Sequence, residues 1–189
     1  MQIEVIWEQL AGNGIEHLKL RMDNNIQADG LAVGVLEDVP YRIRYEIVCD
    51  NGWTVQRATV EDLLKDETLT LIKGADGSWT DEHRKSLEHL KGCTEVDIRI
   101  TPFTNSLPIN RLGLALHESR EITVAYFHVP GLTVSKLDQK YTFLSSEKGL
   151  RTYKYESLDS GFTADIQVNP DGLVTDYPGI FKMIWKRTL

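Results

Sequence analysis

Apolar and polar residues alternate along much of the chain, most clearly in Tyr41–Cys49. Every second residue from Tyr41 is apolar there, and most of the residues between are charged, which predicts a β-strand with one buried face. The same period recurs in residues 95–100 and 162–168, with Glu95, Asp97 and Arg99 on a polar face. Further strands are predicted over Ile3–Trp7, Ile15–Met22, Leu31–Leu36, Thr68–Ile72, Arg151–Glu156 and Ile180–Trp185.

Two turns are predicted from their residue types. Asn51-Gly52 is a preferred two-residue hairpin turn, because both positions need a positive φ. A hairpin closed there would pair Asp50 with Trp53, Val48 with Val55, and Glu46 with Arg57. Asn169-Pro170-Asp171-Gly172 is the second predicted turn, with proline at its second position and glycine at its fourth.

Glu121–Val129 differs from the other strands because it is apolar on both sides. Ile122, Val124 and Tyr126 fall on one face, and Ala125 and Phe127 on the other. A strand of this kind is usually buried on both faces. Something must therefore pack over its second face: another sheet, a helix or a ligand hollow.

Helical signal is scarce, and Thr104–Leu116 is the best candidate. Thr104 or Asn105 could cap such a helix, and Pro108 would then lie in its first turn. Gly113 weakens the prediction. Asp81–Leu90 could form a second, shorter helix.

These elements predict a mainly β protein, with a curved antiparallel sheet or an unclosed β-barrel wrapped around one helix. No linker, repeat or low-complexity tract divides the sequence. We therefore expect residues 1–189 to form a single domain.

Charge and composition narrow the classes of function. The chain carries 28 acidic and 21 basic residues, for a net charge of −7, which argues against nucleic-acid binding. No apolar run approaches the roughly 20 residues of a transmembrane helix. Residues 1–8 lack the features of a secretory signal, so a cytoplasmic location is expected.

Recognisable catalytic and metal-binding motifs are absent from the sequence. Cys49 and Cys93 have no CxxC spacing, which argues against a zinc site or a redox pair. His83 and His89 are six residues apart, so they would lie on different faces of a helix. We therefore assign no catalytic residue, metal or cofactor, and enzymatic activity stays an open alternative.

Residues 101–114, TPFTNSLPINRLGL, form an unusual segment with two prolines and an aromatic before a leucine-rich stretch. In this segment the chain resembles a family of bacterial proteins described as glycolipid-binding, with Asn105, Pro108 and Arg111 at matching positions. The resemblance runs from about residue 5 to 182. Other matching segments are Tyr45–Asp50 with Trp53, Asp76–Trp79, Gly92–Ile98, Gln139–Tyr141 and Leu173–Gly179.

The resemblance implies a fold and a ligand class. The family is similar to periplasmic carriers of lipoproteins and lipids, whose unclosed β-barrel holds a hydrophobic hollow. It therefore implies a lipid-like or glycolipid-like ligand. Arg111 would suit a phosphate or carboxylate at the rim, and Asn105 offers both donors and an acceptor. The ligand-binding candidates are Trp53, Trp79, Asp97, Phe103, Asn105, Arg111, Tyr141 and Tyr155.

Each candidate also has a plain structural alternative. Arg111 would neutralise Asp97 or Asp50 beneath the helix, and Asn105 would only cap it. The aromatic residues would be ordinary core or edge packing.

Two other classes of function compete with ligand carriage. An enzyme acting on a lipid-like or sugar-linked molecule would use Asp50 or Asp97, with Arg111 as an electrostatic clamp. A structural or interaction module would associate through an exposed sheet edge. The sequence leaves the oligomeric state open.

Overall fold

Alternating segments of the chain become strands throughout the computed structural model, which describes residues 1–189. The strands are β1 Gln2–Gln9, β2 Asn13–Met22, β3 Ile26–Leu36, β4 Val39–Cys49, β5 Val55–Asp62, β6 Glu67–Lys73, β7 Trp79–Thr80, β8 Glu95–Ile98, β9 Ser119–His128, β10 Thr133–Glu147, β11 Leu150–Ser157, β12 Thr163–Val168, β13 Val174–Tyr177 and β14 Phe181–Thr188. The helices are α1 Phe103–Leu112 and a 3₁₀ turn at Glu88–Leu90. Each predicted strand overlaps an observed one.

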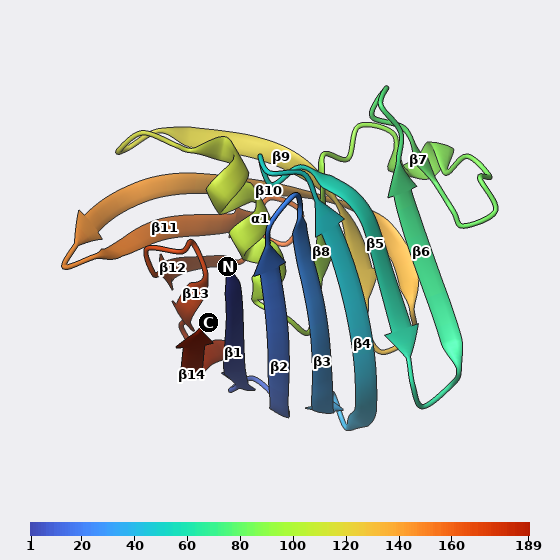
Figure 1. Cartoon of the computed structure of the whole chain (residues 1–189), viewed down its shortest axis with the longest axis horizontal. Helices are drawn as coiled ribbons and strands as arrows, with labels where there is room; N and C mark the ends of the chain where they lie inside the picture. Colours follow the sequence, from blue (N-terminus) through green and yellow to red (C-terminus); the bar gives the residue numbers. More distant parts are fainter.

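All 14 strands form one sheet in the order β7-β6-β5-β4-β3-β2-β1-β14-β13-β12-β11-β10-β9-β8. Neighbouring strands are antiparallel except β8 and β9, which are parallel. Because β1 pairs with β14, the first and last strands of the chain lie side by side in the middle of the sheet (Figure 1).

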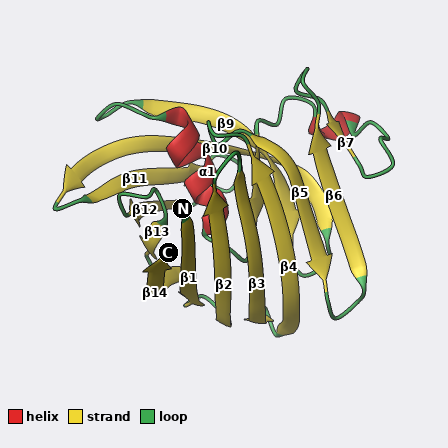
Figure 2. Cartoon of the chain, viewed as in Figure 1, coloured by secondary structure: helices red, strands yellow, loops and turns green.

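The sheet curls so that β9–β11 run across β1–β6, and α1 lies between the two halves (Figure 2). Phe103 and Leu107 of α1 belong to the larger core cluster, whereas Ile109 belongs to the smaller one. The helix therefore joins the apolar faces of both halves. The prediction of a mainly β, curved and unclosed antiparallel sheet around one helix is confirmed.

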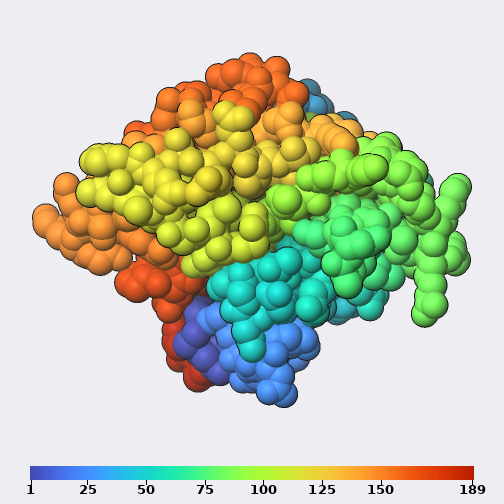
Figure 3. All heavy atoms as spheres, turned by 90° about the horizontal axis from the view of Figure 1, so that it is seen from above, coloured from blue at the N-terminus to red at the C-terminus, as the bar shows by residue number.

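The two edges of the sheet approach each other without pairing as strands. From the β6–β7 edge, the Lys73 ammonium donates to the Thr94 carbonyl oxygen over 2.6 Å. The Trp79 indole Nε1–H donates to the Cys93 carbonyl oxygen over 2.9 Å. Side chains thus bridge the gap that keeps the barrel open. The green segment around β7 projects beyond the rest of the molecule (Figure 3).

Burial on both faces of β9 is confirmed. Ile122 and Val124 belong to one core cluster, and Ala125 and Phe127 to the other. On β8, by contrast, the predicted polar face is wrong, because all four residues of the strand are buried. α1 and β9 both pack against β8, so its two carboxylates lie inside the protein.

The register predicted for the hairpin at Asn51-Gly52, between β4 and β5, is wrong. Cys49 pairs with Val55 and Val48 with Arg57, after a bulge. The Asp50 carboxylate accepts the backbone N–H groups of Gly52 and Thr54, each over 2.9 Å. This side-chain capture makes the loop longer than two residues. Glu46 consequently pairs with Thr59 instead of Arg57, and Trp53 does not pair with Asp50 as a strand partner.

The turn at residues 169–172 forms as predicted. The Gly172 N–H donates to the Asn169 carbonyl oxygen over 2.9 Å, and Gly172 has a φ of 75°. A left-handed backbone at that position favours glycine. The turn leads directly into β13, as the sequence indicates.

The helix begins and ends earlier than predicted. Pro102 precedes its first residue, and the Thr101 hydroxyl accepts the Phe103 N–H over 3.0 Å. Neither Thr104 nor Asn105 caps the helix, and Pro108 lies in its interior. Gly113, with a φ of 54°, ends it in a left-handed C-cap. Within residues 81–90, only the 3₁₀ turn is helical.

No helix in the structure has the length and apolar character needed to cross a bilayer.

Candidate functional site

A cleft of about 490 Å³ is lined by residues from both halves of the sheet and from α1. This volume falls within the range of roughly 300–1,000 Å³ that is typical of small-molecule sites. Ten of its 18 lining residues are hydrophobic, whereas two other hollows, of about 540 and 580 Å³, have three each. The apolar residues of the cleft include Leu36, Leu137, Phe162, Ile180 and Phe181.

The tyrosine hydroxyls divide into two groups. Four of the seven, those of Tyr41, Tyr45, Tyr141 and Tyr153, hydrogen bond to other side chains and lie outside the cleft lining. The other three tyrosines, Tyr126, Tyr155 and Tyr177, all line the cleft.

Within the cleft, these three hydroxyls are largely unengaged by the protein. Only that of Tyr155 has a neighbour that it can bond, Ser157. None of the three is a buried atom without a partner, so each is accessible from the cleft. Burial raises the pKa of all three phenols, and the Asp97 charge raises it further, so they remain protonated donors.

Aromatic rings pack side by side along the cleft wall. The Tyr177 ring centroid lies 6.0 Å from that of Tyr155, 6.4 Å from Phe162 and 6.2 Å from Phe181. Tyr155 and Tyr177 are only 5% and 6% exposed. The wall is therefore a packed aromatic surface that also carries the hydroxyls of Tyr155 and Tyr177.

Asp97 supplies the buried charge of the cleft from β8. The Thr104 hydroxyl donates to its Oδ1 over 2.7 Å, and the Gln139 amide donates to its Oδ2 over 2.6 Å. Burial raises the Asp97 pKa, while these hydrogen bonds oppose the rise. Both contacts are donors, so the site is built to hold Asp97 as an acceptor.

Asn105 connects the cleft to a buried polar network. Its side-chain amide donates to the Tyr141 hydroxyl over 2.9 Å, and that hydroxyl donates to the Gln139 Oε1 over 3.3 Å. Gln139 in turn holds Asp97. Asn105 therefore positions the cleft's carboxylate through two intervening residues.

A second buried acid lies next to the cleft, on β2. Glu16 accepts the Tyr45 hydroxyl over 2.5 Å and the Thr101 hydroxyl over 2.8 Å, and Thr101 lines the cleft. The other Glu16 oxygen is buried without a partner. Burial raises the Glu16 pKa to about 8, which favours the protonated acid near neutral pH.

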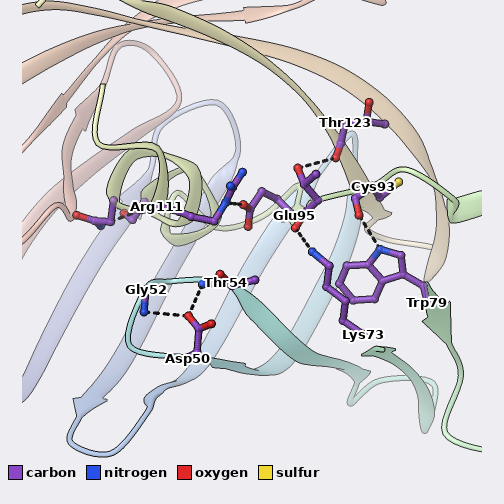
Figure 4. A network of polar contacts seen from close by, with 12 residues as sticks. Asp50, Gly52, Thr54, Lys73, Trp79, Cys93, Glu95, Arg111 and Thr123 are labelled. Carbon is purple, nitrogen blue, oxygen red and sulfur yellow. Dashed lines mark hydrogen bonds and ion pairs between the residues drawn. The ribbon is translucent and has the colours of Figure 1, made fainter. Parts of the chain in front are cut away.

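Arg111 lies outside the cleft, and its predicted partners were wrong. Its guanidinium pairs with Glu95, which is fully buried, instead of with Asp97 or Asp50 (Figure 4). Lys73 approaches the same region from β6 and donates to the Thr94 carbonyl oxygen. Burial raises the Glu95 pKa, and Arg111 opposes that rise.

Four of the five predicted aromatic candidates, Trp53, Trp79, Phe103 and Tyr141, also lie outside the cleft lining. Phe103 is fully buried in the core, and Trp53 packs against it at a centroid distance of 6.5 Å. Trp79 is 1% exposed and bonds to the Cys93 carbonyl oxygen. Of the eight predicted candidates, Asp97, Asn105 and Tyr155 line the cleft, and Tyr141 lies behind Asn105.

Sequence reasoning missed Tyr126, Tyr177 and Thr101 as cleft residues. Tyr126 had a usable signal, because it lies on the doubly apolar strand whose second face had to meet a helix, a sheet or a ligand. Tyr177 had none beyond its type, since its place depends on the pairing of β13 with β12 and β14.

The constellation expected for an enzyme does not form as predicted. Asp97 and Tyr155 share the cleft, but Arg111 is engaged by Glu95 elsewhere. No group of three His, Cys, Asp or Glu side chains could hold a metal ion.

Comparison with known proteins places the chain in a family. A crystal structure of a DUF1089 family protein from Pseudomonas aeruginosa aligns with 88% of this chain and 91% of its own, at 34% identity and a TM-score of 0.78. No curated protein matches the sequence. The sequence profile of the family described as "Putative glycolipid-binding" matches residues 4–183, and the chain belongs to that family.

Proposed function

We propose that this protein binds a lipid-like molecule with a polar head group, of the glycolipid class, in the cleft. The observation that carries the proposal is the three accessible hydroxyls of Tyr126, Tyr155 and Tyr177 beside an apolar wall. An amphipathic ligand fits such a surface, because one end of it needs hydrogen bonds and the other needs to leave water. The family description supports the same class of ligand.

Tail and head would contribute differently to binding. Each methylene removed from water contributes about 0.8 kcal/mol, so six would give about 5 kcal/mol before ordering costs. Each hydrogen bond to the head group adds only about 1 kcal/mol net. The apolar residues, such as Leu137 and Phe181, would therefore supply affinity, and the tyrosine hydroxyls would supply selectivity.

Native mass spectrometry of gently purified protein, followed by organic extraction, tests the proposal. We expect an added mass that extraction releases as one class of amphipathic lipid. A clean unliganded mass that stays unchanged when lipids and glycolipids are offered would reject the proposal.

A pair of matched variants locates the site. Leu137 is half-buried in the cleft, whereas Leu64 is 55% exposed on the turn after β5. Leu137→Asp places a charge on the apolar wall and should weaken binding by about tenfold or more. Leu64→Asp makes the same chemical change outside the cleft and should leave binding unchanged. Equal effects of the two variants would place the ligand elsewhere.

A further inference from the structure

Charged side chains in the cleft are few, and the structure gives each a definite role. Asp97, Arg99 and His128 are the only residues of ionisable acid or base type in its lining besides the tyrosines. Asp97 is 9% exposed and lines the same cleft as the three unengaged phenols. A ligand head group among these phenols therefore lies within reach of a buried negative charge.

The one guanidinium in the lining is already occupied. Arg99 pairs with Glu37 from the β3–β4 turn through both terminal nitrogens. Its Nη1 donates to the Glu37 Oε2 at a distance of 3.5 Å, and its Nη2 donates to the Oε1. The other guanidinium that suits an anion, Arg111, is engaged by Glu95 outside the cleft. His128 shares a hydrogen bond of 2.8 Å with Ser135. The charges of Arg99 and Glu37 cancel each other, so no cation in the cleft lining compensates the charge of Asp97.

The hydrogen-bonding groups of the cleft are also mixed in kind. Each phenol hydroxyl can donate one hydrogen bond and accept others. Hydroxyl groups on a ligand offer both roles and can satisfy all three phenols. An ammonium would be attracted to Asp97, but it offers only donors, so the phenol protons would gain no acceptor from it. A phosphate offers acceptors, but it brings a negative charge towards Asp97 at low local dielectric.

We infer that Asp97 makes the cleft discriminate against phosphate and carboxylate head groups, so that among head groups of the proposed class it takes an uncharged, hydroxyl-bearing one. This inference rests on the proposed function, because it names the class of head group that the same cleft takes. Asp97 sets the discrimination, and Glu37 maintains it by occupying Arg99.

Three ligands with the same tail test the inference: octyl glucoside, octyl phosphate and octylammonium. Isothermal titration below their micelle-forming concentrations, at pH 8 and low salt, measures each affinity with weak electrostatic screening. We expect octyl glucoside to bind tightest, with octyl phosphate about tenfold weaker. Octyl phosphate or octylammonium binding as tightly as the glucoside overturns the inference but leaves the proposed function standing. Failure of all three to bind overturns both.

Three variants identify the source of the discrimination. Asp97→Asn removes the buried charge and should abolish the gap, that is, the difference in affinity between octyl glucoside and octyl phosphate. Glu37→Gln removes the ion-pair partner of Arg99 at the protein surface and should also reduce this difference in affinity. This exposed variant keeps the test available if Asp97→Asn folds poorly. Glu67→Gln makes an equal change of net charge at an exposed β6 residue without an ion pair and should leave the gap unchanged. A gap that responds equally to Glu37→Gln and Glu67→Gln contradicts the inference.

Discussion

Replacing Arg111 with methionine removes the partner of a fully buried carboxylate while keeping most of the side chain's bulk. Glu95 is 0% exposed, and its Oε1 is held by Arg111 while its Oε2 has no partner at all. The Arg111→Met protein would therefore contain a buried charge with only Lys73 near enough to compensate it.

The expected cost follows from this geometry. Breaking a buried ion pair by removing one partner typically destabilises a protein by about 3–5 kcal/mol. Arg111 keeps 25% of its side chain exposed, so water can reach part of the site, and we expect about 3 kcal/mol. Removing both charges, in Arg111→Met with Glu95→Gln, should recover most of that loss, since no uncompensated charge then remains.

Urea unfolding of the wild type, the single variant and the double variant measures these free energies. The single variant's deficit should also shrink as the pH falls. Burial raises the folded-state pKa of Glu95 above its unfolded value, so the penalty is full at neutral pH and is lost as the carboxyl becomes protonated. A deficit below about 1 kcal/mol at pH 7, or a double variant less stable than the single one, would refute this reasoning.

Three further predictions concern the core. Gly30→Ala should destabilise the protein by about 3 kcal/mol in urea unfolding, because the new Cβ would overlap the Tyr45 ring. Gly52→Ala should cost far less, because the new Cβ would approach only the Asp50 carboxylate. Similar losses in the two variants would show that the Tyr45 ring can move aside. Glu16→Gln should gain stability relative to the wild type between pH 5 and pH 9, because the folded-state pKa of about 8 makes ionisation of Glu16 costly as the pH rises; parallel pH profiles would contradict the burial of this acid. Cys49 and Cys93 are at most 2% exposed, and burial raises both thiol pKa values, that of Cys93 to about 11, so a thiol reagent should label neither under native conditions; rapid labelling of either would contradict the packing.

Period-two alternation located most of the strands, because burial of one sheet face leaves a direct trace in the sequence. It failed at β10, Thr133–Glu147, whose inward positions include the polar Gln139 and several half-buried residues. It also failed to show that Asp97 is buried, since one of its hydrogen-bond partners, Gln139, lies 42 residues further along the chain on β10. The Asn51-Gly52 residue types led to a wrong hairpin register, because they do not show that the Asp50 side chain accepts two backbone N–H groups of the loop.

The candidate site was predicted only in part for a related reason. The segment around Asn105 was recognised by its unusual composition, and it does reach the cleft. Arg111 lies about 1.7 turns further along the same helix and faces another region, towards Glu95. Tyr126 and Tyr177 line one cleft only because the sheet curls, and no short-range sequence pattern encodes that arrangement.

A crystal structure of the protein with octyl glucoside tests the central claim most directly. The account predicts the sugar within hydrogen-bonding distance of the hydroxyls of Tyr126, Tyr155 and Tyr177, with the octyl chain against apolar residues such as Leu137 and Phe181. A ligand bound outside this cleft, or a cleft closed by side chains at a saturating ligand concentration, would contradict it.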